Sequence, residues 1–101
     1  MQYLGVLRGS GALTCGEEQM GRADFEIDGF LTRPGEVVGS GEIRMSPEGL
    51  NNAFGRQDLR LTTDDGRVLE VRFSGKRLDP ASDAAHADIG GQLPAASQWR
   101  R

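Results

Sequence analysis

Apolar and polar residues alternate one by one between positions 58 and 75, and this is the strongest local pattern in the chain. The apolar residues of this stretch share one parity and are Leu59, Leu61, Leu69, Val71 and Phe73. Strict alternation on both sides of an Asp-Gly turn is typical of a β-hairpin with one buried and one solvated face. The pattern therefore predicts two antiparallel strands joined around Gly66.

The register of this hairpin follows from both of its faces. If residues 64–66 form a three-residue loop, Leu61 faces Leu69 on the apolar side. A two-residue loop would instead mix apolar and charged residues on each face, so we predict the longer loop. The opposite charges that this register brings face to face are Arg60 with Glu70 and Asp58 with Arg72.

Three stretches upstream show the same alternation, at residues 3–15, 22–32 and 36–45. Each predicts an antiparallel strand with one buried and one solvated face. We expect residues 16–21 to connect the first two strands as a loop. Residues 33–36, with the sequence Arg-Pro-Gly-Glu, predict a type II turn between the second and third strands.

Glycines recur on the apolar parity of these strands, although glycine inside a strand weakens it. Two physical reasons are available: sharp coiling that closes a small barrel, and room for a large residue of the next strand to lie over bare backbone. The expected register across the first turn places Gly11 beside Phe25 and Gly9 beside Ile27. The glycines concerned are Gly5, Gly9, Gly11, Gly29, Gly39, Gly41 and Gly75.

A short helix is predicted after the third strand. Ser46 is a favoured N-cap, Pro47 fits the first helical position, and Gly55 is a natural stop. We expect one or two turns that plug one end of the barrel. Residues 84–93 then predict a last strand, in which Ala85, Ala87 and Ile89 oppose His86 and Asp88.

Together these elements predict an all-β protein of about six antiparallel strands. We expect a small up-and-down barrel or a strongly coiled sheet, with the short helix between the third and fourth strands; a two-sheet β-sandwich is the alternative. The domain is predicted to cover residues 1–93, with 94–101 as a C-terminal tail. An open sheet would leave edge strands that can pair with a second copy, so a homodimer is a further expectation.

The composition bears on the number of domains, the fold class and the partners. A chain of 101 residues forms one domain, and its 15 glycines favour strands and turns over helices. The formal net charge of −3 argues against nucleic acid as a partner, because phosphate binding needs a basic surface. We also expect no membrane partner, since no apolar stretch approaches the roughly 18 residues of a spanning helix.

Cys15 is the only cysteine, so an intramolecular disulfide is excluded. A reducing compartment fits this composition. The first residues lack the basic start and uninterrupted apolar run of an export signal. We therefore expect a cytoplasmic protein.

Candidate chemistry is sparse. Gly-x-Gly occurs at 9–11 and at 39–41, but neither copy completes a dinucleotide fingerprint or precedes a predicted helix. One cysteine and one histidine are too few for a structural zinc site. The carboxylates Asp24, Glu26 and Asp28 share a strand face and are expected to pair with neighbouring arginines. We predict no catalytic motif, no metal and no cofactor.

The leading functional hypothesis is a non-enzymatic binding or accessory module for a protein or a small ligand. Candidate binding residues are His86 and Asp88 on the last strand and Trp99, Arg100 and Arg101 in the tail. Trp and Arg are favoured at the energetic centres of interfaces.

The alternative is a small enzyme with a site at the barrel mouth. His86 would act as the base, and Asp88 or Cys15 would assist it. On a strand, His86 and Asp88 share a face at a separation of about 7 Å, which is too long for a direct hydrogen bond without side-chain reach or a bridging water.

Overall fold

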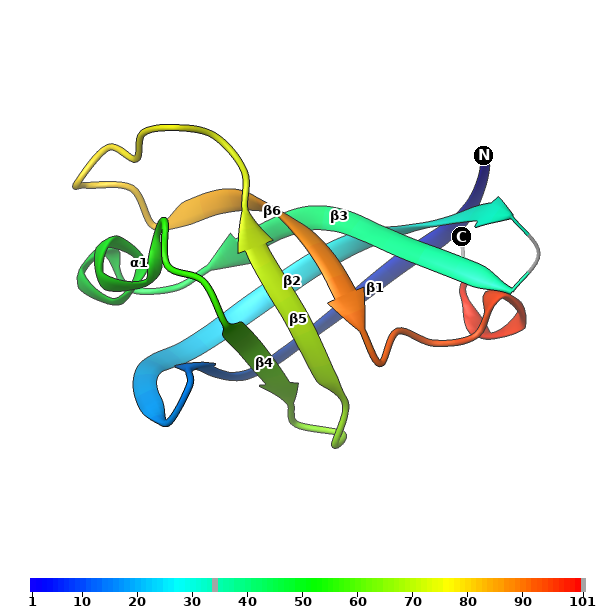
Figure 1. Ribbon diagram of the computed structural model, residues 1–101, viewed down its shortest axis with the longest axis horizontal. Helices are drawn as coiled ribbons and strands as arrows, with labels where there is room; N and C mark the ends of the chain where they lie inside the picture. The colour runs from blue at the N-terminus through cyan, green and yellow to red at the C-terminus, as the bar shows by residue number, and fades with distance from the viewer. Residues whose placement is uncertain (34, 101) are drawn as a thin grey trace.

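The computed structural model describes residues 1–33 and 35–100, and these are built mainly of β-strands (Figure 1). The elements in chain order are β1 (Gln2–Cys15), β2 (Glu18–Arg33), β3 (Glu36–Arg44), α1 (Pro47–Ala53), β4 (Leu59–Thr63), β5 (Val68–Phe73), β6 (Ala84–Gly91) and the 3-10 helix η1 (Ala96–Gln98). Neither helical element in this part of the chain is long and apolar enough to cross a membrane.

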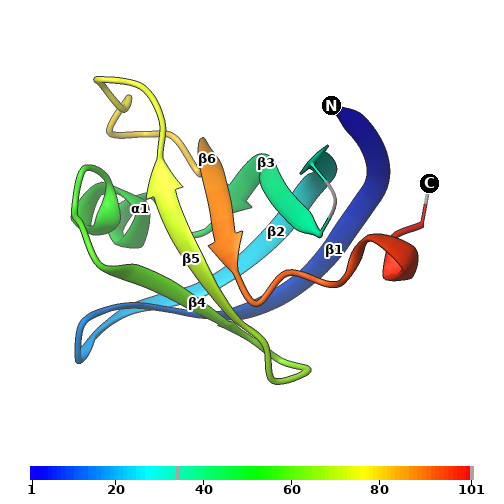
Figure 2. The ribbon, with the colours of Figure 1, turned by 45° about the vertical axis from the view of Figure 1, so that its right-hand side comes forward.

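The six strands form one antiparallel sheet that closes into a barrel in the order β1-β2-β3-β6-β5-β4 (Figure 2). The predicted six-stranded barrel with a helix between β3 and β4 is confirmed, and the sandwich alternative is set aside. The order around the ring differs from a simple up-and-down order, because α1 carries the chain across one barrel end. β4 therefore pairs with β1, and β6 pairs with β3.

Closure between β1 and β4 involves only residues 11–15 of β1. The first half of β1 extends beyond the ring together with the paired part of β2. A homodimer that uses a sheet edge stays a prediction.

The β4–β5 hairpin has the predicted register. Gly66, with φ of 93°, donates its N–H to the Thr63 carbonyl at 2.9 Å and so completes the three-residue loop. The expected pairing of Asp58 with Arg72 is wrong, because Asp58 turns away with φ of 60° and its carboxylate lies 3.4 Å from Arg60 Nη1. The pairs formed are Leu59 with Val71, Leu61 with Leu69, Arg60 with Glu70 and Thr62 with Val68.

The β1–β2 hairpin is tighter than predicted. Cys15 already pairs with Glu18, so the connection is residues 16–17 and the expected loop at 16–21 is wrong. The register consequently shifts by two residues, which brings Gly9 rather than Gly11 opposite Phe25. A β-bulge at Met20 of β2, between the pairs Leu13–Gly21 and Thr14–Gln19, accommodates the one residue left unpaired by the shorter turn. The expected type II turn at 33–36 includes Pro34, which lies outside the described residues.

Close approaches explain several glycines on the buried parity. The expectation for Gly75 is wrong, because it is exposed beyond the end of β5, with φ of 93°, and a Cβ there would meet no atom within 4 Å. A Cβ at Gly9 would lie 2.8 Å from the Phe25 ring, and one at Gly39 would lie 2.8 Å from Ile27 Cγ2. A Cβ at Gly41 would collide with the β2 backbone. Large side chains therefore lie over bare backbone, as predicted. The largest fully buried side chains are Leu13, Ile27, Ile43, Leu50, Leu61 and Leu69.

The helix α1 covers one end of the barrel. Ser46 caps it by accepting a hydrogen bond from the Gly49 N–H at 3.1 Å. Leu50 and Ala53 are fully buried in the shared core, and the Phe54 ring packs against Phe73 with centroids 5.7 Å apart.

The C-terminal segment folds back onto the part of β1 and β2 that extends beyond the ring. A Cβ at Gly29 would lie 2.7 Å from three carbon atoms of the Trp99 ring, so the ring rests directly on the β2 backbone. Trp99 Nε1 donates to the Pro94 carbonyl at 3.0 Å, and the Val6 N–H donates to the Arg100 carbonyl at 2.9 Å. Residues 94–100 are therefore held against the barrel.

A bidentate ion pair joins β2 to the hairpin loop across the end of β1. Arg22 donates to both carboxylate oxygens of Asp64, at 2.8 and 2.7 Å. This hydrogen bonding, with the charge of Arg22, holds the pKa of Asp64 below its usual value and raises the pKa of Arg22.

Candidate functional site

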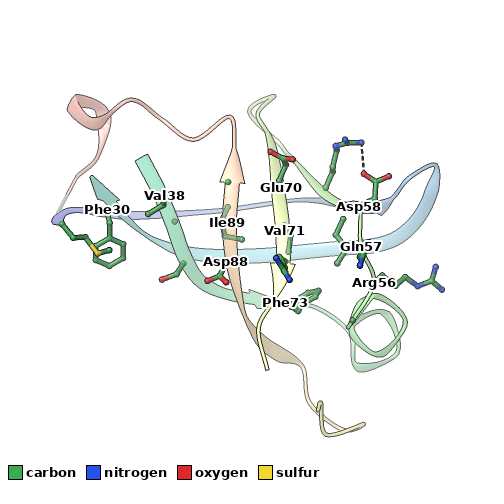
Figure 3. Close-up of a pocket in the computed structure, with 18 residues that line it drawn as sticks. Phe30, Val38, Arg56, Gln57, Asp58, Glu70, Val71, Phe73, Asp88 and Ile89 are labelled. Carbon is green, nitrogen blue, oxygen red and sulfur yellow. Dashed lines mark ion pairs between the residues drawn. The ribbon is translucent and has the colours of Figure 1, made fainter. Parts of the chain in front are cut away.

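A groove of about 1180 Å³ crosses the outer face of the barrel over β3, β6, β5 and the start of β4 (Figure 3). Residues 55–58, which lead from α1 into β4, form its polar wall. Phe30 and Val38 form its apolar wall at the opposite end, and Met1 also lines the groove. Met1 is 88% exposed, and the Phe30 ring packs against Tyr3 with centroids 5.5 Å apart.

The groove is open at its centre because β6 carries a glycine at an outward position. Ile89 points into the core, so Asp88 and Gly90 take the solvent side of the strand. A Cβ at Gly90 would meet no atom within 4 Å. The open space lies between Glu70, the partner of Gly90 on β5, and Val38 on β3.

Two of the arginines that line the groove are already paired. Arg56 Nη1 lies 3.3 Å from Glu18 Oε1, and its Nε donates to the Asn52 carbonyl at 2.7 Å. Arg60 Nη1 lies 3.4 Å from Asp58 Oδ1. These contacts orient both guanidinium groups at the polar wall.

Three other charged side chains on the floor are unengaged. Glu70, Arg72 and Asp88 make no ion pair or side-chain hydrogen bond with any residue that the structure describes. This holds even for Arg72 and Asp88, which lie directly opposite each other on β5 and β6. Because none of the three side chains has a partner in the described chain, their charged ends are available to a ligand.

The sequence candidates on β6 divide between the groove and the surface beside it. Asp88 lines the groove, whereas His86 lies on the same exposed face but is not among the lining residues. Cys15 is half-buried, and its Sγ donates to the Gln57 carbonyl at 3.2 Å. Within the described chain, no hydrogen bond joins the His86 ring to Asp88 or Cys15.

The tail candidates lie away from the groove. The Trp99 ring covers Gly29, and the Arg100 carbonyl is bonded to β1, so both residues hold the C-terminal segment in place. Arg101 lies outside the described residues.

No group of three or more His, Cys, Asp and Glu side chains suited to a metal ion occurs among residues 1–33 and 35–100. The acidic row on β2 has hydrogen-bond partners from β1 instead. Those pairs are Ser10 with Asp24, Arg8 with Glu26 and Tyr3 with Asp28. The expected pairing with arginines holds for Glu26 and is wrong for Asp24 and Asp28, which accept from hydroxyl groups.

Sequence reasoning missed most of the groove. In the sequence, Glu70 and Arg72 are indistinguishable from other polar residues on the solvated face of a strand. The available signal is Gly90, which falls on the polar parity of its strand, whereas Gly39 and Gly41 fall on the buried parity.

Comparison of the chain with protein families, with curated proteins and with solved structures finds no match. A functional assignment therefore depends on the geometry and charge of the groove.

Proposed function

We propose that this protein is a non-enzymatic binding module and that its ligand, a polypeptide segment or a small organic molecule, occupies the groove above Gly90. The open space over this glycine is the observation that supports the proposal most directly. Binding sites typically combine apolar walls with a few polar groups held on rigid elements. The groove has an apolar wall and polar side chains, and the polar side chains of its floor are held on β5 and β6.

The unengaged charges on the floor contribute little to the stability of the fold and are suited to contacting a ligand. An exposed ion pair contributes only about 0–1 kcal/mol to stability, so Arg72 and Asp88 lose little by remaining unbridged. A ligand that covers them excludes water and strengthens each charge-assisted hydrogen bond that it forms. The single cysteine, Cys15, supports a reducing, cytoplasmic location for this activity.

Filling the groove tests the proposal. Gly90→Phe adds an outward side chain whose Cβ meets no atom within 4 Å, so we expect the fold to be retained and binding to be lost. Thr62→Phe adds the same ring on the outward face of β4, at a position that does not line the groove, and is the matched control. Circular dichroism confirms that both variants are folded.

Binding is measured as the shift in Tm caused by defined hexapeptides and by common metabolites. Ligands that stabilise the wild type and Thr62→Phe but not Gly90→Phe support the proposal. It is overturned if no compound shifts the Tm of the wild type, or if every active compound stabilises Gly90→Phe equally.

A further inference from the structure

We infer that the groove binds an extended polypeptide segment through one basic side chain, Arg or Lys, which lies over Gly90 between the carboxylates of Glu70 and Asp88. This inference rests on the proposed function, because it names the ligand of the same groove. Three features support it: the positions of the two carboxylates, the balance of engaged and unengaged charge, and the length of the groove.

The two carboxylates flank the open centre from different directions. Glu70 is the direct strand partner of Gly90, which places their Cα atoms about 4.5–5.5 Å apart. Asp88 lies two residues before Gly90 on the same outward face, at about 7 Å along the strand. Figure 3 shows Glu70 on β5 and Asp88 on the neighbouring strand β6. A cationic group above Gly90 is therefore within side-chain reach of both.

The apolar part of a basic side chain also finds a surface here. Val38 lies on the β3 side of Gly90, and Phe30 continues this surface toward β2. Long basic side chains pack their methylene stems on apolar surface while the charged end stays with polar partners. An anionic side chain in the same place would meet two carboxylates instead.

The balance of charge favours a cation. Arg56 and Arg60 already have carboxylate partners, which leaves two unengaged carboxylates and one unengaged guanidinium, that of Arg72. The formal net charge of the whole chain is −3, which favours the approach of basic partners. Arg72 offers N–H donors to a backbone carbonyl of the bound segment.

The length of the groove favours a polypeptide over a free small cation. Its volume of about 1180 Å³ exceeds the roughly 300–1,000 Å³ of small-molecule sites. Neighbouring strands lie about 4.8 Å apart, so the four steps from β4 across β5, β6 and β3 to β2 span about 19 Å. An extended segment of about six residues, at about 3.3 Å per residue, covers this distance.

A panel of fluorescent hexapeptides tests the inference by anisotropy. The peptides share one sequence with an apolar residue near one end and differ only at a central position, which is Arg, Lys, Gln or Glu; N-acetyl-arginine amide is the small-cation probe. We expect the Arg and Lys peptides to bind at least tenfold more tightly than the Glu peptide. Their affinity should fall as salt is raised.

Single carboxylate variants locate the contact. Glu70→Gln and Asp88→Asn should each weaken the Arg peptide about fivefold to tenfold, because charge-assisted hydrogen bonds are lost. Glu17→Gln removes an exposed carboxylate in the β1–β2 turn that does not line the groove, and should leave binding unchanged.

The outcomes separate this inference from the proposed function. Equal binding of the Arg, Gln and Glu peptides, all abolished by Gly90→Phe, would refute recognition of a basic side chain but would keep the groove as the binding site. Binding of N-acetyl-arginine amide as tight as that of the Arg hexapeptide would refute the inference that the ligand is a polypeptide segment. If Gly90→Phe changes no binding at all, both the inference and the proposed function fail.

Discussion

The contact between Trp99 and Gly29 makes a quantitative test of how the C-terminal segment is held. The Trp99 ring lies so close to the β2 backbone that an added methyl group at Gly29 would be 2.7 Å from three ring carbons. Ordinary carbon contacts lie at about 3.5–4.0 Å. Gly29→Ala must therefore displace the ring by about 1 Å, whereas in a Trp99→Ala background the same methyl group meets an empty site.

The expected energies follow from this geometry. Removing the half-buried Trp99 ring exposes about 100 Å² of apolar surface, worth about 2.5 kcal/mol, and one hydrogen bond worth about 1 kcal/mol. Gly29→Ala alone should cost about 1–2 kcal/mol, because overpacking exceeds the small gain of replacing glycine in a strand. In the Trp99→Ala background Gly29→Ala should be neutral or stabilise by about 0.5 kcal/mol. The coupling free energy is then about 2 kcal/mol.

Urea unfolding followed by far-ultraviolet circular dichroism measures all four proteins of this cycle. Fluorescence is unsuitable because Trp99 is the only tryptophan. Unchanged m-values confirm that the free energies of unfolding can be compared. A coupling free energy below about 0.5 kcal/mol would show that the two sites act independently, and would refute the contact between ring and backbone.

Two further predictions concern the core and the hairpin loop. Leu61→Ala, at a fully buried position, should lower the free energy of unfolding by about 3–4 kcal/mol. Thr62→Ala on the outward face should change it by less than about 0.5 kcal/mol. Equal effects of the two substitutions in urea unfolding would contradict the assigned faces. Because the pKa of Asp64 is lowered in the folded state, its contribution to stability is present above its unfolded pKa and is lost as pH falls through the folded value. Arg22→Gln should return the pKa of Asp64 toward its usual value in an NMR titration, and an unchanged pKa would refute the ion pair.

Local sequence signals predicted the elements well, because their physical causes are local. The loop of the β4–β5 hairpin needs a residue with positive φ, and Gly66 supplies it three residues after Thr63. Both faces of this hairpin then agree on one register. The cap of α1 is equally local, since Ser46 meets the N–H of a residue three positions later.

The β1–β2 register could not be predicted in the same way. Gly9 and Gly11 leave the apolar face of β1 with few side chains, so a shift of two residues keeps apolar opposite apolar and polar opposite polar. Arg8 finds a carboxylate in either register, because Glu26 and Asp28 share a face. The choice is made by the tight turn and the bulge, and neither has a distinctive sequence.

The ring order and the groove arise from contacts between distant parts of the chain. β4 follows β3 in sequence but pairs with β1. The groove gathers outward positions from β3, β4, β5 and β6, each of which is ordinary within its own strand. Only Gly90 is unusual locally, and its meaning depends on knowing which strands lie on either side.

Cys15 gives the protein a chemical reporter that needs no engineering. The thiol lies at the seam where the barrel closes, opposite Leu59, and bonds to the backbone of Gln57, a residue of the polar wall. Reagents reach a half-buried thiol mainly during local opening of the surrounding structure. Since the chain has no second cysteine, the rate of thiol labelling reports local opening at this seam. A ligand that stabilises residues 55–58 should lower this rate.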